Sequence, residues 1–275
     1  MEIIKSFRLH TLPASIFPIV LVWTQGSEEL LGSYKFFIFS LLIGIFLQIS
    51  TNIFNDLIDY NKGVDAHRSD RGVARKNSNR VKMKLIVALL LMTTFILGSR
   101  FMTLHWAYLP IGILSIYLTY GYTGGPFALA YNYLGEIFSF LFFGLVIVLG
   151  SFYAIFGQLT HSAILLGLSC GLHSVFLIMC NNLRDITTDK ENGKNTLAVL
   201  MGKKKYLLLM SSIIISACIN FIFLQSSWSA IAIYGTIHLC LLIWLNFYYA
   251  DIKSKILFKC SIISYFIFFI VMIVF

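Results

Sequence analysis

The chain has 275 residues, of which 58% are hydrophobic and 12% are charged, and its formal net charge is +9. Soluble globular domains carry about 25% charged residues, so this composition excludes an ordinary soluble domain and indicates a polytopic helical membrane protein. The short-period alternation that is typical of a membrane β-barrel is missing from the sequence.

Nine apolar stretches, each close to the length of about 20 residues that crosses a bilayer as a helix, follow one another along the chain. We therefore predict an all-α protein whose residues 1–275 form a single transmembrane domain. Two long polar connections, at about 56–82 and 183–204, interrupt the otherwise short loops. The predicted spans cover about 12–27, 34–55, 83–101, 106–122, 134–156, 161–182, 205–224, 228–249 and 256–274.

The distribution of lysine and arginine predicts the orientation of these spans. All but Lys35 and Arg100 of the 21 basic residues fall at the N-terminus, in or beside the two long connections, or before the last span. This pattern places the N-terminus and both long connections in the cytoplasm and, with nine spans, the C-terminus outside. It fits an integral protein of the cytoplasmic membrane of a prokaryote. Topology and attraction to anionic membrane lipids account for the positive charge, so no nucleic-acid partner is predicted.

Two acidic clusters lie where these long connections begin. Each cluster consists of an asparagine, an aspartate four residues later, and a second aspartate three or four residues after that, so its members share one face of a helix. The two clusters suggest a weak internal repeat. Their members are Asn52, Asp56 and Asp59 in the first, and Asn181, Asp185 and Asp189 in the second.

The chemistry of these acids favours a hard metal ion. Carboxylates at bilayer depth cost about 2.5–3.5 kcal/mol each, so the four aspartates must face water, a cavity or cations. A divalent ion would relieve their mutual repulsion, and oxygen ligands without histidine or cysteine favour Mg²⁺. Because Mg²⁺ binds through one or two carboxylates plus substrate phosphates, the clusters and the nearby basic residues indicate a diphosphate site. A solvated helix end or a salt bridge within the loop is the alternative for each acid.

The segments around both clusters resemble a known family. "NDLIDYNKGVD" resembles the first aspartate-rich motif of the UbiA-type intramembrane prenyltransferases, and "NNLRDITTDKENGKNTLAVLMG" is similar to their second. "RLHTLPASIFP" and "YTGGPFALAYNYLGEIFSFLFFGLVIVLGSFY" are similar to the branch that prenylates 1,4-dihydroxy-2-naphthoate in menaquinone synthesis. The resemblance covers about residues 5–205.

This resemblance implies nine transmembrane helices around a central cavity, which the two motif loops cap on the cytoplasmic side and which opens laterally to the isoprenoid tail. It also implies that the motif acids bind Mg²⁺, with an asparagine assisting. The implied metal ligands are Asn52, Asp56, Asp59, Asp65, Asp185 and Asp189. The implied diphosphate contacts are Arg8, Arg68, Lys190 and Lys194.

Four further residues are candidates for contact with the carbocation or the acceptor. Aromatic faces stabilise cations. Tyr122, which opens "YTGGP", is therefore predicted to stabilise a carbocation. The alternative for Tyr122 and the tyrosines near it in the sequence is an aromatic belt at the membrane interface. Asn55, Asn181 and Glu136 are predicted to contact the acceptor. For Glu136, an intramembrane acid, contact with a nearby cation and a capping or packing role are alternatives.

One departure from a related branch leaves a question open. Enzymes that prenylate 4-hydroxybenzoate usually carry a lysine in the loop after the fourth helix. This chain has no lysine or arginine between Phe101 and Asn182. The sequence does not show which cation replaces that lysine.

The resemblance implies Mg²⁺-dependent transfer of a polyprenyl group from an allylic diphosphate to 1,4-dihydroxy-2-naphthoate, with loss of CO₂, giving demethylmenaquinone. A prenyltransferase with another aromatic acceptor and a terpene cyclase are alternatives within the superfamily. A transporter is the alternative from another class, because intramembrane acids and internal repeats occur there too. Transporter sites usually lie near the bilayer midplane, whereas these acids lie at helix ends.

Overall fold

The computed structural model describes residues 3–26, 34–62, 76–225, 227–247 and 254–275, and within these ranges every regular element is a helix. Short 3₁₀ turns (η1, Ile3–Phe7; η2, Leu9–Thr11; η5, Arg100–Thr103; η6, Leu129–Tyr131) and one π-helix (η7, Leu141–Val146) accompany the α-helices. The α-helices are α1 (Pro13–Thr24), α2 (Tyr34–Asn61), α3 (Asn77–Ser99), α4 (Tyr108–Gly121), α5 (Gly135–Phe140), α6 (Ile147–Phe156), α7 (His161–Arg184), α8 (Ile186–Glu191), α9 (Leu197–Leu224), α10 (Trp228–Phe247) and α11 (Ser254–Val274).

The helices of the described residues confirm a polytopic all-α membrane protein. Five are long and apolar enough to cross a bilayer: Tyr34–Asn61, Ser78–Thr103, Gly135–Phe156, His161–Arg184 and Leu197–Leu224. The segments Ile3–Thr11 and Pro13–Thr24, bent by 48° relative to each other, together make a sixth candidate. Three shorter apolar helices complete the set: Tyr108–Gly121, Trp228–Ile243 and Lys259–Val274.

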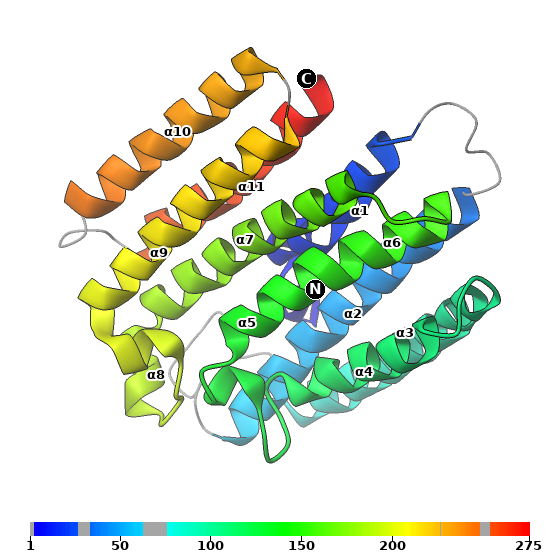
Figure 1. Cartoon of the computed structure of the whole chain (residues 1–275). Coiled ribbons are helices and arrows are strands. Elements are labelled where there is room, and N and C mark those ends of the chain that lie inside the picture. Colours follow the sequence, from blue (N-terminus) through cyan, green and yellow to red (C-terminus); the bar gives the residue numbers. More distant parts are fainter. Residues whose placement is uncertain (1–2, 27–33, 63–75, 226, 248–253) are drawn as a thin grey trace.

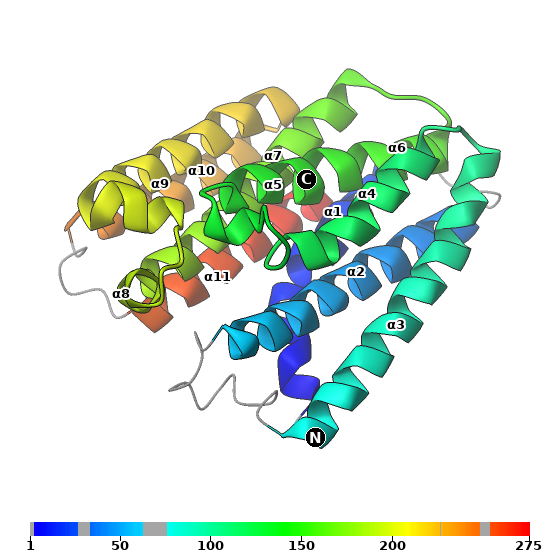
Figure 2. The same ribbon diagram turned by 90° about the horizontal axis from the view of Figure 1, so that it is seen from below.

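Helix α7 lies at the centre of the bundle and is the most buried of the five long spans. Figure 1 shows α9, α10 and α11 on one side of α7 and α1, α6 and α2 on the other, with α3 and α4 at the far edge. The view from below in Figure 2 shows the same separation. One buried apolar core joins α1, α6, α7, α10 and α11, and a second joins α7 to α9.

Both acidic clusters lie on or beside helices, and the predicted limits of the two long connections are wrong. Helix α2 runs to Asn61, so Asp56 and Asp59 lie on its last turns. Hydropathy marks where the apolar segment ends, whereas a helix continues until a breaker stops it, and no proline or glycine occurs between Gly44 and Gly63. The second connection contains α8 and about the first two turns of α9, which bends at Gly202.

The predicted span at 134–156 is a continuous run of helix, but its middle is the π-helix η7. A Cβ atom added at Gly144 would lie 2.6 Å from both the Gly167 carbonyl oxygen and the Gly171 Cα atom of α7. Only glycine therefore permits this close approach, as is common where membrane helices pack. The tight packing holds η7 closely against α7.

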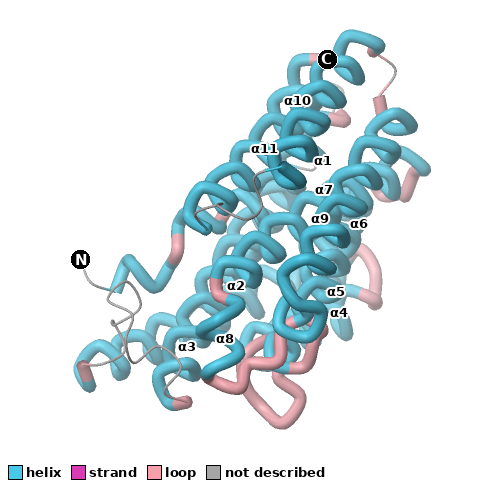
Figure 3. Tube along the Cα trace, turned by 90° about the vertical axis from the view of Figure 1, so that its left-hand side faces the viewer, coloured by secondary structure: helices cyan, strands magenta, loops and turns pink. Residues whose placement is uncertain are grey.

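The elements that carry the two clusters meet at one end of the bundle. Figure 1 shows the C-terminal end of α2, the loop that precedes α5, and α8 together at this end. The tube in Figure 3 shows loop segments between α4 and α5 on the same side as α8. A parallel bridge between Asn132 and Asn195 fixes this loop to the segment after α8.

Candidate active site

A cavity of about 580 Å³ enters the bundle beside both acidic clusters. Its polar end is lined by Asp59 of α2, by Asp185 and Asp189 around α8, and by Lys194. Ser40, at the other end of α2, also lines it. At 1.5 Å per residue, Ser40 and Asp59 lie about 28 Å apart along α2, close to the thickness of about 30 Å of the hydrocarbon core.

The end of the cavity away from the acids is apolar and reaches the outside of the bundle. Phe95 of α3, Met102 of η5 and Ile113 of α4 line it. These three side chains are also exposed on the surface of the protein. The cavity therefore opens through the wall that α3 and α4 form, at a depth where lipid tails would surround the protein.

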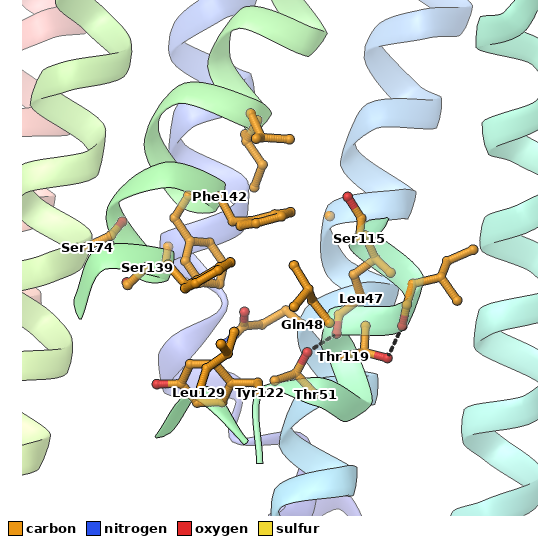
Figure 4. A pocket seen from close by; sticks show the side chains of 18 of the residues that line it. Leu47, Gln48, Thr51, Ser115, Thr119, Tyr122, Leu129, Ser139, Phe142 and Ser174 are labelled. Atoms are coloured by element: carbon orange, nitrogen blue, oxygen red, sulfur yellow. Dashed lines mark hydrogen bonds between the residues drawn. The ribbon is translucent and has the colours of Figure 1, made fainter. Parts of the chain in front are cut away.

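The middle of the cavity is lined by small hydroxyl side chains that form hydrogen bonds with their own helices. The hydroxyl of Thr51 donates to the Leu47 carbonyl at 2.9 Å, and that of Thr119 donates to the Ile116 carbonyl at 2.7 Å. Figure 4 shows these two residues together with Gln48, Tyr122 and Phe142 around this part of the cavity. The hydroxyl groups of Thr51 and Thr119 are therefore already engaged by their own helices.

The first acidic cluster holds the N-terminal segment against α2. Asp56 is 3% exposed, and its carboxylate forms an ion pair with Arg8. The amide of Asn52 donates to the Phe7 carbonyl at 2.9 Å and to the Thr11 hydroxyl at 3.1 Å. Asp56 therefore lies behind Arg8 and does not itself line the cavity, whereas Arg8 and Asn52 do.

The next turn of α2 contacts the loop between α4 and α5. Asp59 is 2% exposed and accepts a hydrogen bond from the Tyr131 hydroxyl at 2.7 Å. The side-chain oxygen of Asn55 accepts a hydrogen bond from the Thr123 hydroxyl. Asp59 and Asn55 both line the cavity, so this loop forms part of the site.

The second cluster lies at the junction of α7 and α8. Asp185 caps α7, and its two carboxylate oxygens accept hydrogen bonds from Arg184 at 2.8 Å each. Asn181, Asp185 and Asp189 do not lie on one continuous helix, because α7 ends at Arg184 and α8 begins at Ile186. Backbone hydrogen bonds from Asp185 to Asn181 and from Asp189 to Asp185 nevertheless preserve the helical spacing across the junction. Asp189, 5% exposed, lies 3.9 Å from the Lys194 ammonium group.

The structure thus gathers most of the predicted site residues around one cavity. Those that line it are Arg8, Asn52, Asn55, Asp59, Tyr122, Glu136, Asn181, Asp185, Asp189 and Lys194. Lys190 is exposed and does not line it, while Asp65 and Arg68 lie outside the described residues. In the part of the chain that the structure describes, no three carboxylate, histidine or cysteine side chains group together as ligands of one metal ion.

Glu136 lies on the cavity wall and joins three helices. This side chain, 6% exposed, begins α5, and its Oε1 accepts hydrogen bonds from Asn182 Nδ2 at 2.8 Å and from the Tyr206 hydroxyl at 2.5 Å. Asn182 belongs to α7 and the fully buried Tyr206 to α9. These contacts support the packing role that the sequence left as an alternative.

We expect Glu136→Leu to destabilise the protein by about 1–3 kcal/mol for each buried donor left without an acceptor. Glu136→Gln keeps a carbonyl acceptor and should cost clearly less. Thermal unfolding of both variants in detergent tests this difference. Equal loss of stability in the two variants would show that the hydrogen bonds from Asn182 and Tyr206 do not hold the three helices together.

Tyr122 follows α4 and is positioned by close packing. It is half-buried and lines the cavity. Its carbonyl accepts a hydrogen bond from the Ala130 amide at 2.8 Å, which closes the loop between α4 and α5. A Cβ atom at Gly135 would lie 3.1 Å from the Tyr122 hydroxyl. By contrast, Tyr117 and Tyr120 of α4 are exposed and do not line the cavity, as expected for an interfacial aromatic belt.

Sequence reasoning missed three residues that contact the site without lining the cavity, namely Lys62, Tyr131 and Tyr206. Tyr206 gives no sequence signal, because it lies among apolar residues of a predicted span. Lys62 and Tyr131 were visible only as a basic residue of the cytoplasmic loop and as one tyrosine of a cluster.

Comparison with known proteins shows the family of the chain. The sequence pattern of the UbiA prenyltransferase family matches residues 12–271. The chain is 34% identical to a 1,4-dihydroxy-2-naphthoate octaprenyltransferase of Escherichia coli over 82% of this chain and 78% of that protein. It is 32% identical to the Bacillus subtilis protein of the same name, over 74% and 67% of the two chains.

Solved structures share the fold. A UbiA homologue from Aeropyrum pernix matches with a TM-score of 0.70 at 16% identity, over 96% of this chain and 97% of that one. A UbiA homologue from Archaeoglobus fulgidus, solved with GPP and Mg²⁺, matches with a TM-score of 0.68 at 16% identity over 99% of both chains.

Proposed function

The chain belongs to the UbiA prenyltransferase family, and on this basis we propose that it transfers a polyprenyl group from an allylic diphosphate to 1,4-dihydroxy-2-naphthoate. The ring carboxylate would leave as CO₂ and the diphosphate as the leaving group, giving demethylmenaquinol, the reduced form of demethylmenaquinone. The observation that carries the proposal is the convergence of Asp59, Asp185 and Asp189 on one cavity whose remaining wall is largely apolar. The relatives from Escherichia coli and Bacillus subtilis are both named for this acceptor.

The donor set fits Mg²⁺. The two clusters offer carboxylate oxygens and no sulfur or imidazole ligand, as Mg²⁺ prefers. Each would contribute one or two carboxylates, the number that Mg²⁺ usually takes alongside substrate phosphates. The proposed ligands that line the cavity are Asp59, assisted by Asn52, in the first cluster and Asp185 and Asp189 in the second. Asp56 is proposed as a further ligand, and it would have to exchange its ion pair with Arg8 for the metal ion. Bound Mg²⁺ would draw electrons from the leaving diphosphate as a Lewis acid, and the homologue from Archaeoglobus fulgidus was solved with this ion and GPP.

The chain's own residues would position both substrates. Arg8 and Lys194 line the acidic end of the cavity and would bind the diphosphate oxygens. The apolar end of the cavity, called the apolar arm below, would hold the prenyl chain and exclude water from the reacting carbon. The Tyr122 ring would face the developing cation. Asn55 and Asn181, which line the same end, are the proposed acceptor contacts.

We further propose that the protein spans the membrane nine times. The five long helices, the bent N-terminal pair and the three shorter apolar helices together supply that number of segments. The acidic end of the bundle would face the cytoplasm, because it adjoins the two connections that are richest in lysine and arginine. The N-terminus would then be cytoplasmic and the C-terminus outside.

The test of the function is one incubation of the purified protein with Mg²⁺, an allylic diphosphate and either 1,4-dihydroxy-2-naphthoate or 4-hydroxybenzoate. Prenylated naphthoquinol and CO₂ are expected only with the first acceptor. Transfer to 4-hydroxybenzoate would indicate a different acceptor class, and a cyclised hydrocarbon without acceptor would indicate a cyclase. In a separate experiment with protein in vesicles, uptake of substrate without formation of any product would indicate a transporter.

The cavity also predicts a chain-length effect. Gly112 of α4 lines the apolar arm, and a Cβ atom there would meet nothing within 4 Å. Gly112→Leu should crowd a long chain, and overpacking costs about 1–3 kcal/mol. We expect the ratio of octaprenyl to geranyl transfer to fall about tenfold, the factor that 1.4 kcal/mol represents.

Gly235→Leu in α10, equally open but away from the cavity, is the control. An unchanged ratio in the Gly112 variant would place the prenyl chain elsewhere.

A further inference from the structure

The loop between α4 and α5 contacts both acidic clusters through residues next to Tyr131. On one side, the Tyr131 hydroxyl donates to Asp59 Oδ1 at 2.7 Å. On the other side, the Tyr133 amide donates to the Asn195 carbonyl at 3.0 Å, next to the backbone bridge from Asn132 to Asn195. Tyr131 therefore lies between the end of α2 and the segment that follows α8.

The ring of Tyr131 attracts one lysine from each side. The Lys62 ammonium nitrogen, just beyond the end of α2, lies 3.5 Å from the ring centroid. The Lys194 ammonium nitrogen, after α8, lies 5.5 Å from the same centroid. Both distances are within the range of cation–π attraction. Lys62 also donates to the Thr123 carbonyl at 3.3 Å.

This arrangement brings two like charges together, which has a cost. Burial lowers the pKa of Lys62, the Asp59 carboxylate opposes this shift and the charge of Lys194 adds to it. A purely structural contact would need only one cation on the ring. Two ammonium groups drawn to one ring, beside a cavity lined by Lys194 and Arg8, instead describe a surface suited to a multiply charged anion.

We propose that Tyr131 is a positioning residue, which presents Lys62 and Lys194 together to the diphosphate of the prenyl donor. The proposal rests on the function proposed above and adds Lys62 to the residues that contact this group. It also offers an answer to the question that the sequence left open. The two lysines that flank Tyr131 would supply positive charge where a related branch carries a lysine in the loop itself.

The test is calorimetric binding of inorganic pyrophosphate, in the presence of Mg²⁺, to the full chain purified in detergent. Tyr131→Leu removes the ring and should raise the dissociation constant about tenfold, the size expected from losing cation–π contacts at a partly buried site. Tyr131→Phe keeps the ring and should bind pyrophosphate within about twofold of the unmodified protein. Tyr117→Leu, an exposed tyrosine of α4 outside the cavity, should not change binding.

A double-mutant cycle separates positioning from general stability. Lys62→Met should weaken pyrophosphate binding several-fold in the unmodified protein and hardly at all in the Tyr131→Leu background. An equal loss in both backgrounds, or unchanged binding by Tyr131→Leu, overturns the proposal. If Tyr131→Leu does not fold, the comparison of two lysine variants tests the proposal instead. Lys62→Met must then weaken pyrophosphate binding more than Lys84→Met, which changes an exposed lysine of α3.

The outcomes for this proposal and for the proposed function are distinct. A wild-type protein that transfers prenyl groups and binds pyrophosphate, but shows no coupling between Tyr131 and Lys62, contradicts only the positioning role. A wild-type protein that neither binds pyrophosphate nor forms a prenylated product contradicts the function, and the positioning role with it.

Discussion

Asp59→Asn is expected to lower kcat/KM for prenyl transfer by about 10²–10³, the loss that follows removal of one electrostatic contact to a developing charge. The fold should survive this change. The asparagine oxygen can still accept the hydrogen bond that Tyr131 donates to Asp59, so no buried donor is left without a partner. The variant changes one property only: it removes the negative charge of Asp59 from the polar end of the cavity.

The measurement is transfer in membranes across a range of Mg²⁺ concentrations, with thermal unfolding in parallel. Glu191→Gln is the matched control, because Glu191 is an exposed acid of α8 outside the cavity and undergoes the same chemical change. It should retain nearly full activity. Wild-type turnover by Asp59→Asn would remove Asp59 from the proposed metal ligands. Loss of activity together with loss of folded protein would point to a structural role instead.

The acids of the site could be predicted from the sequence because membrane burial makes each of them costly. A carboxylate that ends an apolar helix must have a partner or a function, and the spacing from Asn52 to Asp59 places both on one face. The structure brings the two clusters to one cavity as this reasoning expects. Their immediate partners could not be predicted, because Asp59 and Tyr131 are separated by 72 residues and meet only through tertiary packing.

The limits of the helices were harder to predict for a related reason. Periodicity and hydropathy report the apolar face of a helix, and they do not report its hydrogen bonds. Helix α2 therefore extends beyond its apolar part to Asn61. The π-helix at Leu141–Val146 contains Gly144, which closely approaches α7, and a contact between two distant segments does not show in the hydropathy of either.

The ion pair between Arg8 and Asp56 gives the second large expected effect. Arg8 adopts a left-handed backbone conformation, with φ 47° and ψ 56°, which costs a residue with a side chain about 1–2 kcal/mol. The contacts of its neighbours hold the segment in place, because Asn52 binds the Phe7 carbonyl and the Thr11 hydroxyl. The nearly buried Asp56 carboxylate therefore depends on the Arg8 guanidinium for its charge balance.

Arg8→Met is expected to destabilise the protein by about 3 kcal/mol, because removing one partner leaves a buried charge uncompensated. Replacing both partners, in Arg8→Met with Asp56→Met, should recover most of this stability, since a buried ion pair exchanged for apolar side chains is often neutral. Transfer activity should stay lost in the double variant, because a thioether replaces both a proposed metal ligand and a proposed diphosphate contact. Thermal unfolding and product formation, measured on the same preparations, separate the two effects.

A double variant that regains stability and transfers at the wild-type rate would show that the pair only fastens the N-terminal segment. One that remains as unstable as Arg8→Met would show that Asp56 is not the partner that stabilises Arg8.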